Sequence, residues 1–275
     1  FSSYPVQRST AATTSVSSAH NEGFIAYVSR NSDGNAYVSV YDATTNQPFL
    51  VNATVAAVST GPVRVLALGT YFYILYVSGT DLAWKRIDLA APSTLSAATL
   101  LGFSDVSATA RPDADVYVAA LETTAIVAYQ TGSNTTKYFY LRSNGTVGTS
   151  LNGGYPNAAT LAYDSDAGLT IRADDANEQF FIGTCSNASG SLAIHGISGN
   201  FLTVFTNVIV VLPTSSTGAL NSMTIGVLTG GSIVLYYGKN GVTSRDDLTG
   251  QYRVTFTVGA GFTSPSNTAS YLMQA

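Results

Sequence analysis

The stretch GFIAYVSRNSDGNAYVSVYD, residues 23–42, contains two short runs of aromatic and β-branched residues on either side of a polar centre. Runs of this kind, bounded by Gly, Asn, Asp and Ser, are typical of two antiparallel strands. The centre contains the pair Asp33-Gly34, which favours a tight hairpin turn. An acid at such a turn also suits a metal site or a catalytic acid. Comparison with the other repeats of the chain shows whether Asp33 belongs to a functional site or only to a turn between two strands.

The two-strand pattern recurs along the chain. Its copies cover 15–29, 63–78, 116–130, 159–173 and 223–238. Their second strands are separated by roughly 50, 50, 45 and 65 residues, the spacing of one propeller blade per repeat. A third strand with more polar alternation follows each copy, at 36–42, 82–88, 136–142, 178–184 and 251–257, and a weaker fourth strand follows at 48–56 and 93–101. Four antiparallel strands in this order describe one blade.

We therefore predict an all-β fold, a β-propeller of five to six blades of four-stranded antiparallel sheets. It forms a single domain over residues 1–275, which we expect to be part of a larger protein. The hairpin at 191–205 is either a shortened sixth blade or an insertion, and residues 269–275 are expected to pair with the N-terminal segment and close the ring. A large β-sandwich is the alternative, because it also contains short strands at regular spacing.

The composition excludes two classes of partner. Only 10% of the 275 residues are charged, the formal net charge is −4, and no run of Lys or Arg occurs. The chain therefore lacks the basic patch that nucleic-acid binding requires. The longest apolar segment, residues 201–212, is too short to span a bilayer and contains Thr and Asn, so we predict no membrane insertion.

No catalytic residue is predicted. His20 and His195 lie in different repeats, and the chain contains no nucleophile elbow, zinc-binding helix motif, phosphate-binding loop or dinucleotide fingerprint. A glycosidase needs two carboxylates that flank the scissile bond. The expected inner strands at 63–68, 116–121, 159–163 and 222–227 contain no acid. We therefore predict a protein that is not an enzyme and has no cofactor.

Two groups of residues are weak candidates for binding. Asp164, Asp166 and Asp175 match a calcium loop only in part, because the other ligand positions are missing, and a solvated turn explains them better. We therefore predict no metal site. The clustered aromatics Tyr71, Tyr73, Tyr138 and Tyr140 suit stacking on a sugar or contact with a protein, and packing between blades is their alternative role.

Residues 23–52 resemble a degenerate propeller unit with an apolar strand, a dipeptide turn, a Tyr-rich strand and the pattern Asp42-x-x-Thr45-x-x-Pro48. Such units occur in bacterial surface proteins and in phage structural proteins. The low charge and the abundance of Ala, Ser, Thr, Gly and Asn also resemble phage tail and virion components, and tail nozzle proteins carry a β-propeller domain of about this size.

The resemblance implies a non-enzymatic structural component of a phage tail or other virion, which contributes to host-surface attachment. Its implied partners are neighbouring copies of itself, other tail or virion proteins and a host-surface glycan. The first alternative is a carbohydrate-binding, lectin-like propeller of a secreted or surface protein, located outside the cell. The second alternative is a glycoside hydrolase.

The other repeats decide the meaning of the turn at Asp33. Its expected equivalents are residues 78–81, 131–134 and 174–178. A polar turn recurs in these copies, often with Gly, whereas an acid at this place does not. Asp33 and Gly34 are therefore predicted to form the hinge between the second and third strands of the first blade.

Overall fold

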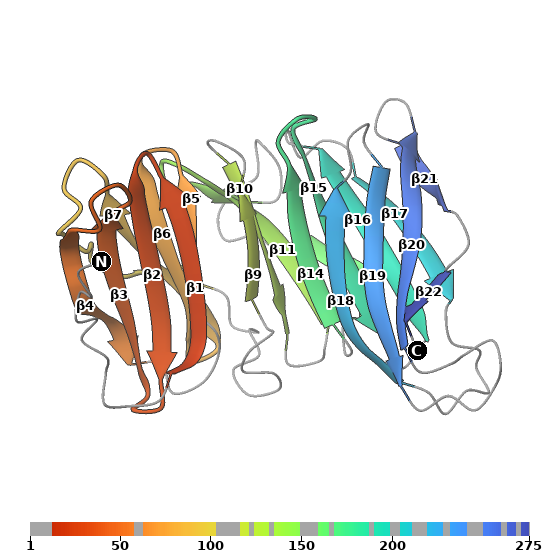
Figure 1. Cartoon of the computed structure of the whole chain (residues 1–275), viewed down its shortest axis with the longest axis horizontal. Helices are drawn as coiled ribbons and strands as arrows, with labels where there is room; N and C mark the ends of the chain where they lie inside the picture. The colour runs from red at the N-terminus through yellow and green to blue at the C-terminus, as the bar shows by residue number, and fades with distance from the viewer. Residues whose placement is uncertain are drawn as a thin grey trace.

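The computed structural model describes residues 13–57, 63–102, 116–120, 124–131, 135–148, 159–164, 168–186, 190–198, 204–210, 219–227, 232–240, 250–259, 263–267 and 271–274. These residues form twenty-two strands and no helix. The strands build five antiparallel sheets that follow one another in chain order (Figure 1). The described residues therefore contain no helix that could cross a membrane.

The strands of each sheet are neighbours in sequence. The first sheet contains β1 (Thr13–Asn21), β2 (Phe24–Asn31), β3 (Asn35–Asp42) and β4 (Pro48–Ala57). The second contains β5 (Val63–Leu68), β6 (Tyr71–Ser78), β7 (Asp81–Asp88) and β8 (Thr99–Leu100). The third contains β9 (Val116–Ala120), β10 (Thr124–Gln130), β11 (Thr135–Arg142), β12 (Val147–Gly148) and β13 (Ala159–Asp164).

The last two sheets repeat the arrangement. The fourth contains β14 (Gly168–Asp174), β15 (Gln179–Ser186), β16 (Ser191–Ser198) and β17 (Val204–Val210). The fifth contains β18 (Ala219–Val227), β19 (Ser232–Asn240), β20 (Gly250–Gly259), β21 (Thr263–Asn267) and β22 (Tyr271–Gln274). The first strands of successive sheets, β1, β5, β9, β14 and β18, lie next to one another in that order. The predicted β-propeller of four-stranded blades is confirmed, with five blades in the described part of the chain.

A strand between two neighbouring sheets must bury side chains on both faces. β6 has the continuous apolar sequence YFYILYVS, which is typical of such a strand. Phe72, Ile74 and Tyr76 pack toward the first sheet. The alternate residues Tyr73 and Leu75 pack toward the third sheet. The sequence of β6 thus accounts for its position in the interior of the propeller.

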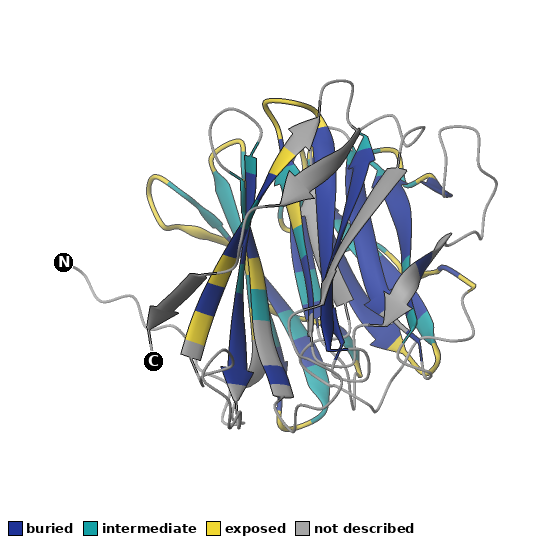
Figure 2. Ribbon diagram, turned by 90° about the vertical axis from the view of Figure 1, so that its right-hand side faces the viewer, coloured by how far each residue is buried: buried dark blue, intermediate teal, exposed yellow. Residues whose placement is uncertain are grey.

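Four hydrophobic clusters connect the five sheets. They lie between the first and second, second and third, third and fourth, and fourth and fifth sheets, and buried residues dominate the interior strands (Figure 2). No strand of the first sheet makes an extended contact with the fifth sheet among the described residues. Figure 1 shows these two sheets at opposite ends of the longest axis. The described blades therefore form an open series, in which each terminal sheet has one face that no described blade covers.

The structure corrects the assignment of strands in the fourth repeat. Residues 159–164 form β13, which pairs with β11 in the third sheet, so the first strand of the fourth blade is β14. The hairpin at 191–205 is then neither a sixth blade nor an insertion, since it supplies the third and fourth strands, β16 and β17. Residues 174–178 consequently connect the first and second strands of this blade, not the second and third. In the sequence analysis the fourth blade thus starts one strand too early, which also explains the long spacing before the fifth repeat.

Among the described residues, the C-terminal segment does not close the ring as predicted. β22 pairs with β20 of the fifth sheet, through Gln251 with Gln274 and Arg253 with Tyr271. This strand therefore extends its own blade and pairs with no described strand of the first sheet. Residues 1–12 lie outside the described residues.

Candidate functional site

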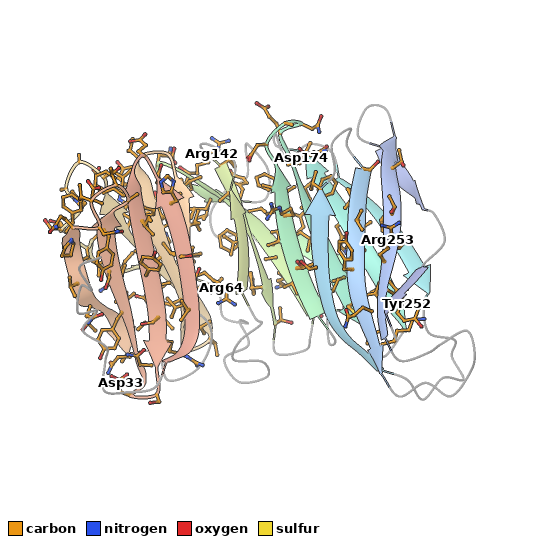
Figure 3. All side chains as sticks on the ribbon, viewed as in Figure 1. Asp33, Arg64, Arg142, Asp174, Tyr252 and Arg253 are labelled. Atoms are coloured by element: carbon orange, nitrogen blue, oxygen red, sulfur yellow. The ribbon has the colours of Figure 1, made fainter. Side chains whose placement is uncertain are left out.

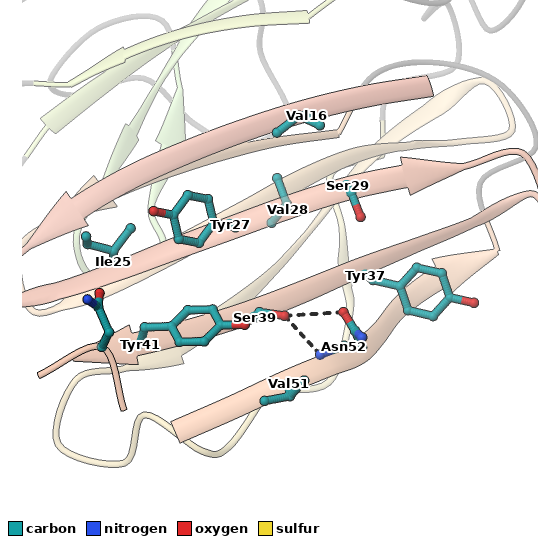
Figure 4. Close-up of a pocket in the computed structure, with 11 residues that line it drawn as sticks. Val16, Ile25, Tyr27, Val28, Ser29, Tyr37, Ser39, Tyr41, Val51 and Asn52 are labelled. Atoms are coloured by element: carbon teal, nitrogen blue, oxygen red, sulfur yellow. Dashed lines mark hydrogen bonds between the residues drawn. The ribbon is translucent and has the colours of Figure 1, made fainter. Parts of the chain in front are cut away.

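A pocket of about 460 Å³ opens on the outer face of the first sheet, the face that turns away from the second sheet (Figure 4). It is lined by Val16, Ile25, Tyr27, Val28, Ser29, Tyr37, Ser39, Tyr41, Asn46, Val51 and Asn52. All of these residues belong to the first sheet or to the connection between β3 and β4. The volume falls in the range of small-molecule sites in proteins.

The alternation of large and small side chains explains the hollow. Tyr37, Ser39 and Tyr41 project from the same face of β3 because side chains two residues apart share a face. On β2, Tyr27 lies directly opposite Ser39, and Ser29 lies opposite Tyr37. Tyr27 and Tyr37 thus each have a serine as their cross-strand neighbour, whereas Tyr41 lies opposite Ile25, and the small serine side chains leave space between the rings.

A β-bulge in β4 adds a polar wall. Val38 pairs with Ala53 and Val40 pairs with Leu50, so Val51 and Asn52 both lie opposite Ser39. A bulge of this type redirects side chains at the edge of a sheet. Asn52 has a φ of 47°, and its backbone N–H donates to Ser39 Oγ at 2.9 Å. The Ser39 hydroxyl in turn lies 3.4 Å from Asn52 Oδ1 (Figure 4).

The turn between β2 and β3 fixes the position of one tyrosine. Asp33 accepts a hydrogen bond from the Asn35 backbone N–H at 2.9 Å and another from the Tyr37 hydroxyl at 2.9 Å. The bond from Asn35 holds the pKa of Asp33 below its ordinary value, and the bond to Asp33 raises the pKa of Tyr37. Gly34 has a φ of 79°, which this turn requires. The predicted hinge is confirmed, and it also orients a ring of the pocket.

The next turn positions an amide at the rim of the pocket. Asp42 accepts hydrogen bonds from the backbone N–H groups of Thr44 and Thr45 at 2.8 and 2.7 Å, which lower the pKa of its carboxyl group. The backbone N–H of Asn46 donates to the Asp42 carbonyl at 2.9 Å. Asn46 has a φ of 56°, a conformation that Asn adopts more readily than most residues. This turn therefore holds the Asn46 side chain beside the pocket.

The pocket is open to solvent and rich in apolar surface. Val16 is 63% exposed, Tyr27 is 45% exposed and Val51 is 44% exposed. The rings of Tyr27 and Tyr41 meet edge to face with their centroids 6.0 Å apart. Exposed apolar patches of this kind commonly mark binding surfaces.

The four tyrosines predicted as binding candidates lie elsewhere. Tyr138 and Tyr140 are buried in the cluster between the third and fourth sheets. Tyr73 is buried between the second and third sheets, and its hydroxyl donates to the Ser143 carbonyl at 2.7 Å. Their alternative role, packing between blades, is the one that the structure supports. Tyr71 alone among the four is only partly buried.

Tyr71 belongs to an aromatic cluster at the end of the second sheet. Its ring centroid lies 6.0 Å from that of Tyr73, and Tyr73 lies 5.1 Å from Trp84. The guanidinium carbon of Arg86 lies 4.6 Å from the centre of the Tyr71 ring, within the range of a cation–π interaction. The structure thus places Tyr71 and Tyr73 in a packed aromatic cluster and not in the pocket.

The calcium candidates fall largely outside the described part of the chain. Asp166 and the side chain of Asp164 are outside the described residues. Asp175 is exposed in the turn between β14 and β15. The described residues contain no group of three or more His, Cys, Asp or Glu side chains placed to hold a metal ion.

The expectation that the inner strands contain no acid is wrong for the fourth blade. The shift of one strand makes β14 its inner strand, and β14 ends with the buried residue Asp174 (Figure 3). The Asp174 carboxylate accepts hydrogen bonds from Asn177 Nδ2 at 2.8 Å and Gln179 Nε2 at 2.7 Å. Both bonds close the turn after β14, so this acid has a structural role in the described contacts.

The pocket residues are not among the binding residues predicted from the sequence, although the sequence contains a pattern that points to them. In the stretch 23–42 the tyrosines Tyr27, Tyr37 and Tyr41 occur at odd positions, each near a serine two residues away. This alternation predicts rings on one face of a hairpin. It does not predict whether another sheet covers that face.

Comparisons with known proteins identify the fold. No family model and no curated protein matches the sequence. A protein from Lactobacillus plantarum is 12% identical in a match that covers 94% of this chain and 72% of that one, with a TM-score of 0.58. The BP39L lectin from Burkholderia pseudomallei is 10% identical over 87% of this chain and 76% of the lectin, with a TM-score of 0.51. These likenesses show a propeller fold and nothing further.

The NanB sialidase from Streptococcus pneumoniae is also similar, with 12% identity and a TM-score of 0.49. The match covers 90% of this chain and 42% of the sialidase. A likeness this weak indicates neither activity nor substrate.

The predicted structural role in a phage tail or other virion is contradicted. The similar structures include a bacterial lectin, and no tail or virion protein is among those described above. The prediction depended on a low charge and a repeated strand pattern, which propellers of other kinds share. The expected tail partners and the virion location lose their support with it.

Proposed function

We propose that this propeller binds a neutral saccharide in the pocket of the first sheet. The observation that carries the proposal is the composition of the lining, in which tyrosine rings surround serine hydroxyls and asparagine amides and no side chain is charged. The likeness to a lectin propeller is compatible with the proposal.

The chemistry of the lining suits a sugar ring. A pyranose has C–H groups on its faces and hydroxyl groups around its edge. The exposed ring of Tyr27 offers an apolar surface for a C–H face. Ser29, Ser39 and Asn46 offer groups that donate and accept hydrogen bonds. The pocket thus presents both kinds of contact that a saccharide needs.

The same lining favours binding over hydrolysis. Glycoside cleavage requires two carboxylates that flank the bond. The residues of the pocket include neither a carboxylate nor an imidazole. We therefore propose a lectin-like module of a secreted or surface protein that recognises a glycan and leaves it intact.

A glycan array followed by calorimetry tests the proposal. The wild-type domain is expected to bind one or more neutral glycans, and Tyr27→Ala should weaken that binding about tenfold or more, since truncation of a central aromatic contact commonly costs 1–2 kcal/mol or above. Tyr71→Ala, which removes a partly buried tyrosine outside the pocket, is the matched control and should leave affinity unchanged.

Two results would count against this function. An array without any hit would remove the evidence for saccharide recognition. Binding that survives Tyr27→Ala and disappears in Tyr71→Ala would move the site to the aromatic cluster of the second sheet.

A further inference from the structure

Each of the two terminal sheets has one face that no other sheet of the described residues covers. The second, third and fourth sheets are packed on both faces by the hydrophobic clusters described above. The outer face of the first sheet instead leaves Val16, Tyr27 and Val51 exposed. This face therefore has the apolar character of an inner blade surface without the covering sheet that the other blades have.

The outer face of the fifth sheet has a different character. Tyr252, Val254 and Phe256 of β20 pack on the fourth sheet, so Arg253 projects from the opposite face. The strand register aligns Arg253 with Tyr236 of β19. Gln251 and Arg253 are exposed, and Tyr236 is partly exposed. This outer face thus offers a tyrosine ring next to a cation.

The charged side chains that border the outer face of the first sheet differ in sign from Arg253 on the outer face of the fifth. Glu22, Asp33 and Asp42 lie in the turns at the two ends of the first sheet, and no cation lines its pocket. Arg253 is an exposed cation on the outer face of the fifth sheet. Contact between opposite charges steers association and sets the relative orientation of the two surfaces.

We infer that the outer face of the first sheet docks the outer face of the fifth sheet of a second copy of this chain. The contact would continue the series of sheet-on-sheet interfaces that the chain already makes four times. Two copies related by a twofold axis can make this contact twice, once in each direction, which gives a closed dimer. The docked sheet would cover the pocket, so docking and saccharide binding exclude one another, a consequence that rests on the proposed function.

Sedimentation velocity without any saccharide tests the docking. The wild-type protein should form dimers that dissociate on dilution. Val51→Glu on the first sheet and Arg253→Glu on the fifth sheet should each give monomers, and both positions are exposed, so the fold should tolerate the changes. Leu100→Glu alters an exposed apolar residue outside both faces and should leave the dimer intact.

A mixing experiment is the most specific test of the inference. In an equal mixture of the two monomeric variants, the intact first-sheet face of Arg253→Glu can still dock the intact fifth-sheet face of Val51→Glu. Dimers should therefore reappear in the mixture. A wild-type protein that stays monomeric at every concentration overturns the inference. Loss of the dimer in Val51→Glu alone, without rescue by mixing, also overturns it, because that pattern indicates contact between two first sheets.

The saccharide separates this inference from the proposed function. A glycan identified on the array should dissociate the wild-type dimer when added in excess. A dimer that persists with the glycan bound would contradict the mutual exclusion. Restored dimers in the mixture together with an array free of hits would support the docking and reject the saccharide site.

Discussion

Phe139→Ala should lower the free energy of unfolding by about 4 kcal/mol, as expected for removal of a large buried aromatic side chain. Phe139 is fully buried in the cluster between the second and third sheets. Its ring centroid lies 6.3 Å from that of Tyr129. The substitution leaves a cavity between two sheets whose backbones are held by their own strand ladders, so the site cannot collapse to fill it.

Tyr27→Ala is the matched control, because it removes an aromatic side chain of similar size from the open face of the first sheet. It should change the unfolding free energy by about 1 kcal/mol or less in dilute protein. Urea unfolding of both variants gives the two values. A loss of several kcal/mol for Tyr27→Ala at low concentration would mean that the first and fifth sheets pack together within one chain, against the open series of blades.

Acidification should destabilise the protein through His195. Its side chain is fully buried in the fourth sheet, and burial lowers the pKa of its imidazole from 6.5 to about 4. Nε2 lies 3.5 Å from Thr184 Oγ1. The folded state therefore takes up this proton only at a lower pH than the unfolded state.

The direction of the effect follows from proton linkage. Between pH 6.5 and about 4 the unfolded chain binds more protons at this position, so the free energy of unfolding falls as the pH falls. The stabilisation is complete above about pH 6.5, and its loss approaches about 3 kcal/mol near and below pH 4. Other acidic groups also titrate in this range, so the contribution of His195 is a difference between two proteins.

His195→Gln provides that difference, since it keeps a neutral polar side chain that does not titrate. Urea unfolding of both proteins at pH 7.5, 5.5 and 4.5 should show a smaller loss of stability for the variant. With each curve referred to its own value at pH 7.5, the difference between the two proteins should grow as the pH is lowered. Parallel curves for the two proteins would show that His195 does not carry the acid sensitivity.

Much of the fold could be predicted from the sequence because its signals are local. The hairpin at 23–42 combines period-two alternation with an Asp-Gly turn, and both signals lie within a few residues of each other. The same reasoning placed most strands of the first three sheets. It failed at 159–173, since residues 159–164 and 168–174 look like the two strands of one hairpin but belong to different sheets. Local alternation does not indicate where one blade ends and the next begins.

The binding candidates show the same limit. Tyr138 and Tyr27 both lie in Tyr-containing strands of similar composition. Tyr138 is buried because the fourth sheet covers its face, whereas Tyr27 is exposed because no described blade covers the outer face of the first sheet. The difference depends on contacts between residues far apart in the chain.

By itself, then, the sequence determined the strands, the hairpin turns and the repetition of a four-stranded blade, since alternation and turn chemistry act between neighbouring residues. Only the tertiary structure decided that the series of blades stays open. Whether a face is covered depends on packing between whole sheets. This packing leaves the pocket at Tyr27, Ser39 and Asn52 open to solvent and buries the tyrosines that lie between the inner sheets.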